Sequence, residues 1–144
     1  MQTRHFAVFL ALSACCAFGA ATAADLPRSP SPQGVELYFI SPKDGDTVTS
    51  PLTVRFGLRG MGVAPAGLAM EHTGHHHLLI DTAPPAFNLP VPADANHVHF
   101  GKGQTEAQVT LAPGRHTLQL LLADHLHIPH DPPVMSKPIT VTVR

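Results

Sequence analysis

The chain has 144 residues, with nine Lys and Arg, ten Asp and Glu, and a formal net charge of −1 when histidine is neutral. This balance offers no basic patch, so nucleic acid is excluded as an expected partner. Both cysteines, Cys15 and Cys16, lie close to the N-terminus. The rest of the chain has no thiol, which excludes the cysteine-based zinc motifs.

The first 24 residues have the pattern of an export signal. Arg4 and His5 form a short basic start, an apolar run covers residues 6–18, and Ala21-Thr22-Ala23 is a small-x-small cleavage site. The apolar run is too short to span a bilayer as a mature helix. We therefore expect residues 1–24 to be a signal peptide that directs the protein to the periplasm of a bacterium.

Leu12-Ser13-Ala14-Cys15 has the form of a lipoprotein cleavage box, which leaves a second possibility open. If this box is used, Cys15 becomes the lipidated first residue and the protein is anchored to a membrane. We favour soluble export because the apolar run continues past Cys15 to the later cleavage site. In either case no intramolecular disulfide is expected in the folded domain, although the periplasm would permit one.

Residues 25–34 are rich in proline and are expected to be an extended linker. From residue 35 onward, apolar side chains recur at every second position, and no helical periodicity is present. Turn-forming residues separate about seven short segments of this kind, at residues 35–39, 52–58, 78–81, 97–100, 105–111, 116–123 and 139–143. The pattern predicts one all-β domain over residues 35–144, an antiparallel two-sheet sandwich that is immunoglobulin-like in a broad sense. A small closed barrel is the main alternative.

Three His-x-His pairs are the most informative feature of this domain: His75/His77, His97/His99 and His125/His127. Two residues along a strand advance about 6.6 Å and return the side chain to the same face. Each pair can therefore direct two imidazoles at one ion, and neutral imidazole is a preferred ligand of copper and zinc. If strand ends bring the tracts around His75 and His125 together, four to five imidazoles meet at one site.

The three consecutive histidines cannot all serve one ion from a regular strand. His76 points to the face opposite His75 and His77, and it shares that face with Leu78 and Ile80, which is the face expected in the core. We expect a metal site built mainly from His75, His77, His99, His125 and His127, with His76 and His130 as the next candidates.

Each tract can also be interpreted without a metal. The triple histidine can be an exposed polar strand end, and residues 125–130 can form a Pro-rich turn whose imidazoles cap backbone carbonyls. Asp124 and other acids could orient histidines by hydrogen bonds or act as a base. The sequence contains no nucleophile elbow, no His-Glu-x-x-His helix and no phosphate-binding glycine loop, so we predict no catalytic residues.

Four longer motifs carry a family resemblance. They are Gly74-His75-His76-His77-Leu78-Leu79-Ile80-Asp81, His99-Phe100-Gly101-Lys102-Gly103-Gln104-Thr105-Glu106, His116-Thr117-Leu118-Gln119-Leu120, and Asp124-His125-Leu126-His127-Ile128-Pro129-His130-Asp131-Pro132-Pro133-Val134-Met135-Ser136. Together they closely resemble a family of short exported bacterial proteins whose shared domain has no known function. The resemblance covers nearly all of Val35 to Arg144. It implies an exported single domain with a histidine-rich face, and it carries over no activity.

These observations favour an exported protein that binds a copper or zinc ion as a buffer, carrier or sensor, and that is not an enzyme. The alternative is a metal-free interaction module of the cell envelope with a cell-envelope protein as partner. Its clustered histidines would gain charge between about pH 7 and pH 5. A small metalloenzyme is the least favoured hypothesis. Membrane association is expected only if Cys15 is lipidated.

Overall fold

The computed structural model of the protein describes residues 26–144. The signal peptide expected over residues 1–24 lies outside the described residues, and so does Cys15. The described chain contains the strands β1 (Glu36–Ser41), β2 (Thr47–Val48), β3 (Leu52–Arg59), β4 (Gly62–Val63), β5 (Thr73–Ile80), β6 (His97–Phe100), β7 (Glu106–Val109), β8 (Gly114–Ala123) and β9 (Ile139–Val143). Across residues 26–144 no helix is long and apolar enough to cross a membrane.

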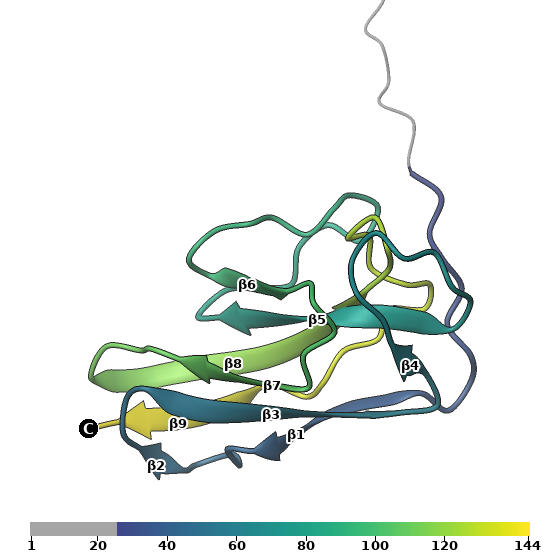
Figure 1. The fold of residues 1–144 in the computed structure, drawn as a ribbon. Coiled ribbons are helices and arrows are strands. Elements are labelled where there is room, and N and C mark those ends of the chain that lie inside the picture. The colour runs from purple at the N-terminus through teal and green to yellow at the C-terminus, as the bar shows by residue number, and fades with distance from the viewer. Residues whose placement is uncertain (1–25) are drawn as a thin grey trace, which may run out of the picture.

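The strands form two sheets that enclose the core between them (Figure 1). The smaller sheet has the order β1-β3-β7, and the larger has the order β2-β9-β8-β5-β4 with β6 also paired to β5. This architecture confirms the predicted all-β sandwich and excludes the closed barrel. The two-residue strands β2 and β4 were not predicted, because each is a short stretch that pairs in parallel with a longer strand.

The core between the sheets follows the period-two pattern of the sequence. The apolar residues of β3 and β8 that alternate with polar ones are buried there. The inward set comprises Leu37, Phe39, Leu52, Val54, Phe56, Leu78, Ile80, Phe100, Val109, Leu111, Leu118, Leu120, Leu122, Val134, Val141 and Val143. Burying one such side chain stabilises the fold by about 1.5–3 kcal/mol relative to leaving it exposed.

Part of the outer face of the larger sheet, along β5, is buried as well, and this was not expected. Every residue of β5 from Gly74 to Ile80 is buried, so the strand is covered on both faces. The connections over residues 81–96 and 124–138 lie over the outer face (Figure 1), and Val91 donates its N–H to the His127 carbonyl at 2.8 Å. The space beneath these two connections is where the histidines gather.

The segment that the sequence indicates as a linker is held against the domain. Pro30 and Asp131 form a parallel β-bridge, and the Ser31 N–H donates to the Asp131 carbonyl at 3.0 Å. Residues near position 30 therefore lie beside the connection between β8 and β9, which follows them by about a hundred residues.

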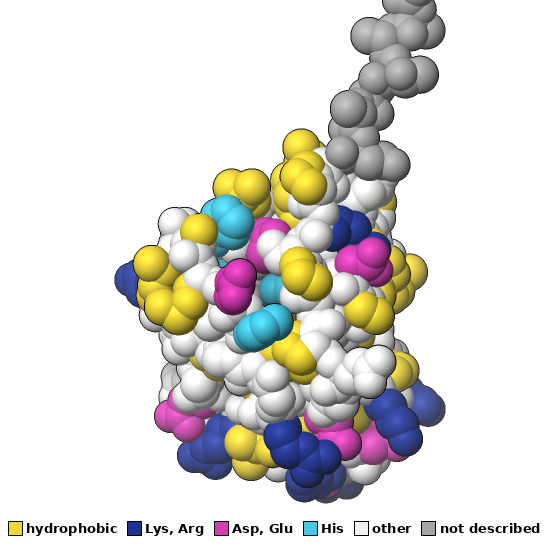
Figure 2. Space-filling view, turned by 90° about the vertical axis from the view of Figure 1, so that its right-hand side faces the viewer, with side chains coloured by type: hydrophobic (Ala, Val, Ile, Leu, Met, Phe, Trp, Pro, Cys, Tyr) yellow, Lys and Arg dark blue, Asp and Glu magenta, His cyan; other side chains and the backbone are white. Residues whose placement is uncertain are grey.

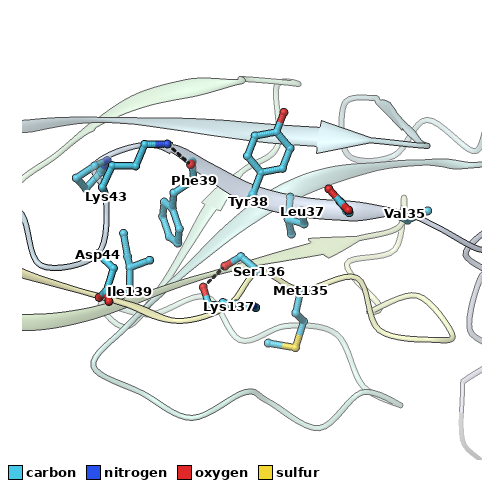
Figure 3. Close-up of a pocket in the computed structure, with 12 residues that line it drawn as sticks. Val35, Leu37, Tyr38, Phe39, Lys43, Asp44, Met135, Ser136, Lys137 and Ile139 are labelled. Carbon is cyan, nitrogen blue, oxygen red and sulfur yellow. Dashed lines mark hydrogen bonds between the residues drawn. The ribbon is translucent and has the colours of Figure 1, made fainter.

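A groove of about 520 Å³ runs along β1, between that strand and residues 135–139 (Figure 3). Tyr38 stands at its rim, and the Lys43 ammonium donates to the Phe39 carbonyl at 3.4 Å. None of the residues that line the groove is a histidine. The groove is thus separate from the histidine chemistry of the larger sheet.

Candidate metal centre

The register of β5 with its neighbours brings three histidines onto one face. His77 lies opposite His99 of β6 and opposite Leu121 of β8, while His75 lies opposite Ala123 of β8. Residues directly opposite each other in antiparallel strands share a face of the sheet. His75, His77 and His99 therefore project together from the outer face, beneath the covering connections.

The ring nitrogens of these three residues converge. The Nε2 atoms of His75 and His77 are 3.0 Å apart. One ligand atom from each of His75, His77 and His99 lies within 4.8 Å of the other two. Among residues 26–144 this is the one group of three or more His, Cys, Asp or Glu side chains with such spacing. A group of this kind can hold a metal ion.

His127 adds a fourth imidazole from the connection after β8. Its ring centre is 4.8 Å from that of His99, 5.0 Å from that of His75 and 6.1 Å from that of His77. The ring stands nearly perpendicular to those of His75 and His77, with interplanar angles of 78° and 80°. His127 therefore lies beside the other three rings and is carried by a loop rather than by a strand, but it is not part of the group whose ligand atoms lie within 4.8 Å of one another.

Asp124 shapes the turn that carries His127. Its carboxylate Oδ1 accepts the N–H groups of Leu126 at 2.9 Å and of Ile128 at 3.0 Å, and its own carbonyl accepts the N–H of His127 at 2.9 Å. Burial raises the pKa of Asp124, but hydrogen bonds from Ser29 and from these amides outweigh it and leave the pKa below its usual value. The carboxylate is thus ionised at neutral pH and accepts three hydrogen bonds.

The histidines of β5 are neutral because they are buried. His75 is 0% exposed and His77 is 1% exposed. Burial, followed by the nearby His127 and His99, lowers the pKa of His75 to about 4, and burial together with the other three rings lowers the pKa of His77 to about 2. Metal ions bind the neutral form of imidazole, so these residues are in the ligand form at neutral pH.

These buried rings have few hydrogen bonds. The Nδ1 atoms of His75 and His77 are buried and have no hydrogen-bond partner among the described residues. Leaving a buried polar group unpaired costs about 1–3 kcal/mol. The two Nε2 atoms are within hydrogen-bond distance of each other when one ring carries the proton there, and a bound ion would replace that contact by two metal–nitrogen bonds.

The cluster is reached from solvent through His99. This side chain is exposed as a whole. Partial burial of its ring, followed by the nearby His127, lowers the pKa of its imidazole. Its ring lies over Gly101, where an added Cβ would stand 2.3 Å from the His99 Cε1 atom and 2.4 Å from Nε2. Only the absence of a side chain at position 101 leaves room for this orientation.

A family model for a domain of unknown function, DUF4399, matches residues 54–144. The chain belongs to this family. The match begins within β3 and includes all four clustered histidines. No curated protein and no solved structure matches the chain at a significant level. The family resemblance predicted from the sequence is confirmed, and its description leaves the activity open.

Three of the seven histidines predicted as ligands stand apart from the cluster in this DUF4399 chain. His76 faces the core, with its ring centre 4.9 Å from that of Phe56 and neither ring nitrogen paired among the described residues. His130 is buried, and its Nε2 lies 3.1 Å from the Thr73 carbonyl. This contact fits the metal-free interpretation, in which imidazoles of residues 125–130 cap backbone carbonyls. His125 lines a separate pocket of about 410 Å³. Ligation by any of the seven stays a prediction.

The charges of the DUF4399 chain are unevenly distributed. Figure 2 shows histidines together with acidic side chains in the upper half of one face, while most Lys and Arg side chains lie at the opposite end. Away from the cluster, His97 pairs with Asp94 at 2.8 Å and His116 pairs with Asp81 at 2.6 Å. On the face seen in Figure 2, the histidines are thus separated from most of the Lys and Arg side chains.

Two residues that support the cluster were not singled out from the sequence. Gly101 was named only as part of a family motif, although its place two positions after His99 is a signal that a side chain there would meet the ring. Ser29 donates to the Asp124 carboxylate at 2.6 Å across 95 positions of sequence, and no local pattern indicates that contact.

Proposed function

We propose that this protein is exported and binds one divalent transition metal ion, zinc or copper(II), which it buffers or carries in the periplasm. The observation that carries the proposal is the convergence of ligand nitrogens from His75, His77 and His99 on the covered face of the larger sheet. His127 lies in ring contact with all three and is the fourth ligand of the proposed site.

The donor set favours a divalent ion. Imidazole nitrogen suits zinc and copper(II), whereas thiolate and thioether ligands select copper(I). With a metal–nitrogen bond of about 2.0 Å, four imidazoles in a tetrahedral arrangement place their ring centres about 5 Å apart. Five of the six distances between ring centres in the cluster are 4.8–5.1 Å, and the sixth is 6.1 Å. A square-planar arrangement would need two long distances, so zinc is the first choice and copper(II) the second.

Binding is a better account of this site than catalysis. The carboxylate whose charge acts on His75, that of Asp124, accepts hydrogen bonds from the Ser29 hydroxyl and from two backbone amides. A carboxylate held in this way is a poor general base because three of its roughly four lone-pair sites are already occupied. Four protein ligands would also leave no open position on a tetrahedral ion, which is typical of non-catalytic sites.

The surroundings of His99 suit exchange of the ion with another molecule. Leu68 and Leu126 are 47% and 53% exposed, and their loops are joined by a hydrogen bond from the Gly67 N–H to the His125 carbonyl at 3.0 Å. The exposed His99 is the ligand from which a protein partner of the cell envelope would receive the metal.

The test is the metal content and affinity of the tag-free mature protein recovered from periplasm. Elemental mass spectrometry followed by titration with zinc and copper should give about one equivalent per chain. A His77→Leu variant should lose this binding, whereas a His116→Gln control, altered at a ring that pairs with Asp81, should keep it. Absence of binding at micromolar metal would overturn the proposal and favour the metal-free interaction module.

A further inference from the structure

Residues 28–31 cross the connection between β8 and β9 and are called here the N-terminal strap. The Asp131 N–H donates to the Ser29 carbonyl at 2.9 Å, and the Ser31 N–H donates to the Asp131 carbonyl at 3.0 Å. The Ser31 hydroxyl adds a bond to the Pro132 carbonyl at 2.8 Å. The strap is therefore paired to this connection as a short ladder of the kind found in a β-sheet.

Arg28 fixes the strap to the same connection by its side chain. The guanidinium donates from Nε to the Pro129 carbonyl at 3.0 Å and from Nη2 to the His130 carbonyl. It also pairs with the Asp131 carboxylate at 3.2 Å and lies 5.6 Å from the centre of the Phe87 ring. One side chain thus binds three successive residues of the connection after β8 and also contacts the connection between β5 and β6.

Ser29 acts on the turn that carries His127. Its hydroxyl donates to Oδ2 of Asp124 at 2.6 Å, while Oδ1 of the same carboxylate accepts the Leu126 and Ile128 amides. His127 has a φ of 66°, a left-handed conformation that is unfavourable for an L-residue other than glycine. The turn therefore needs external hydrogen bonds to keep His127 in this conformation, and Ser29 supplies one of them.

We propose that Ser29 and Arg28 are positioning residues of the metal centre. The strap holds the Asp124 turn in shape, so the His127 imidazole stands beside His75 and His99 before a metal arrives. Metal binding then does not have to order the loop, and removing that ordering cost raises affinity. This inference rests on the proposed metal-binding function, and it gives the proline-rich segment before β1 a role in that function.

The strap can be tested without disturbing the sandwich. Among the described residues, the core cluster between the sheets draws on Val35 and later positions and on none of residues 26–34. Substitutions at Ser29 should therefore leave the cooperative unfolding of the core in place and change only the loop and the site.

The experiment is a titration of the mature protein with cobalt(II), whose visible absorption reports coordination number and geometry, followed by competition with zinc. Ser29→Ala should lower the affinity for both ions by about 10-fold, as loss of an outer hydrogen bond to a metal site does, and should change the cobalt spectrum. Ser29→Thr keeps the hydroxyl, so its metal affinity and its cobalt spectrum should match those of the unaltered protein. Ser31→Ala removes only the bond to the Pro132 carbonyl and is the matched control.

The decisive comparison is made in a His127→Asn background. There Ser29→Ala should have no further effect on affinity, because the imidazole that the strap positions is absent. Equal affinity and spectrum of Ser29→Ala and the unaltered protein would overturn this inference and leave the proposed function standing. An unaltered protein that binds neither cobalt nor zinc would overturn both.

Discussion

The Nε2 atoms of His75 and His77 lie 3.0 Å apart although both side chains are almost completely buried. Alternate residues of a strand stand about 6.6 Å apart, so the two rings must lean toward each other to meet. They do so with ring centres at 4.8 Å and an interplanar angle of 43°. Burial of two neutral imidazoles that leaves both Nδ1 atoms unpaired is unfavourable for folding, and the converging nitrogens are a feature that a metal site explains.

His127 and His125 should differ in their effect on metal binding. His127 is in ring contact with the cluster, whereas His125 lines a separate pocket. His127→Asn, chosen because asparagine tolerates the left-handed conformation, should weaken zinc binding by about 100-fold or more. His125→Asn should change it little. Competition with a coloured chelator measures both, and a reversed order of the two variants would refute this assignment of the fourth ligand.

Replacing His77 by leucine should stabilise the metal-free protein while abolishing metal binding. The substitution removes a buried ring with an unpaired nitrogen from a place beside the apolar Leu121 and Leu79. We expect a gain smaller than the roughly 1–3 kcal/mol of one unpaired group in the free energy of unfolding, measured with urea in the presence of EDTA, because His75 loses its Nε2 contact at 3.0 Å. Adding zinc should stabilise the unaltered protein and leave His77→Leu unchanged. A metal-free variant less stable than the original would contradict the claim that the site is unfavourable for folding.

Acid should destabilise the metal-free protein between about pH 6.5 and pH 4, in part through His76. Burial lowers the pKa of His76 from 6.5 to about 4. Between these values the unfolded chain binds a proton that the folded chain does not, so stability falls as the pH falls. For His76 alone, the decrease in the free energy of unfolding approaches roughly 3 kcal/mol.

Urea unfolding in EDTA at about pH 7, 6 and 5 measures this dependence. His76→Leu should flatten the slope and keep metal binding, because the ring faces the core and not the cluster. An unchanged slope in this variant would show that other groups account for the acid sensitivity.

Gly101→Ala should weaken metal binding through His99. The new methyl group would stand 2.3 Å from the His99 ring and 3.3 Å from the Ala66 Cβ, so the ring must move away. We expect zinc affinity to fall by about 10-fold. In a His99→Ala background the same change should cost little more, because the ring that collides is gone. Additive losses in the double variant would indicate that the glycine acts on the backbone instead.

Much of the fold could be predicted because its strands obey a simple alternation. Residues 52–58 alternate apolar and polar side chains, and they form β3 with the apolar set inward. The same rule separates His76 from His75 and His77, and the structure confirms that His76 faces the core while the other two face outward. Periodicity along one strand decides which face a side chain occupies.

The membership of the cluster could not be predicted in full, because it depends on contacts between distant segments. His99 joins the cluster through the register of β6 with β5, and the sequence of neither strand alone determines that register. β8 ends at Ala123, so strand alternation does not govern His125 and His127. The turn at Asp124 separates them instead, and the Ser29 hydroxyl that supports this turn comes from the opposite end of the domain sequence.

In the proposed site, one ion lies between His75, His77, His99 and His127. Anomalous diffraction from crystals of the zinc-loaded protein, recorded on both sides of the zinc absorption edge, tests it most directly. We predict a single strong peak about 2.0 Å from a ring nitrogen of each of the four residues, in tetrahedral arrangement. A zinc-loaded crystal without a peak at these rings, or with its peak at His125 and His72 instead, would contradict the account.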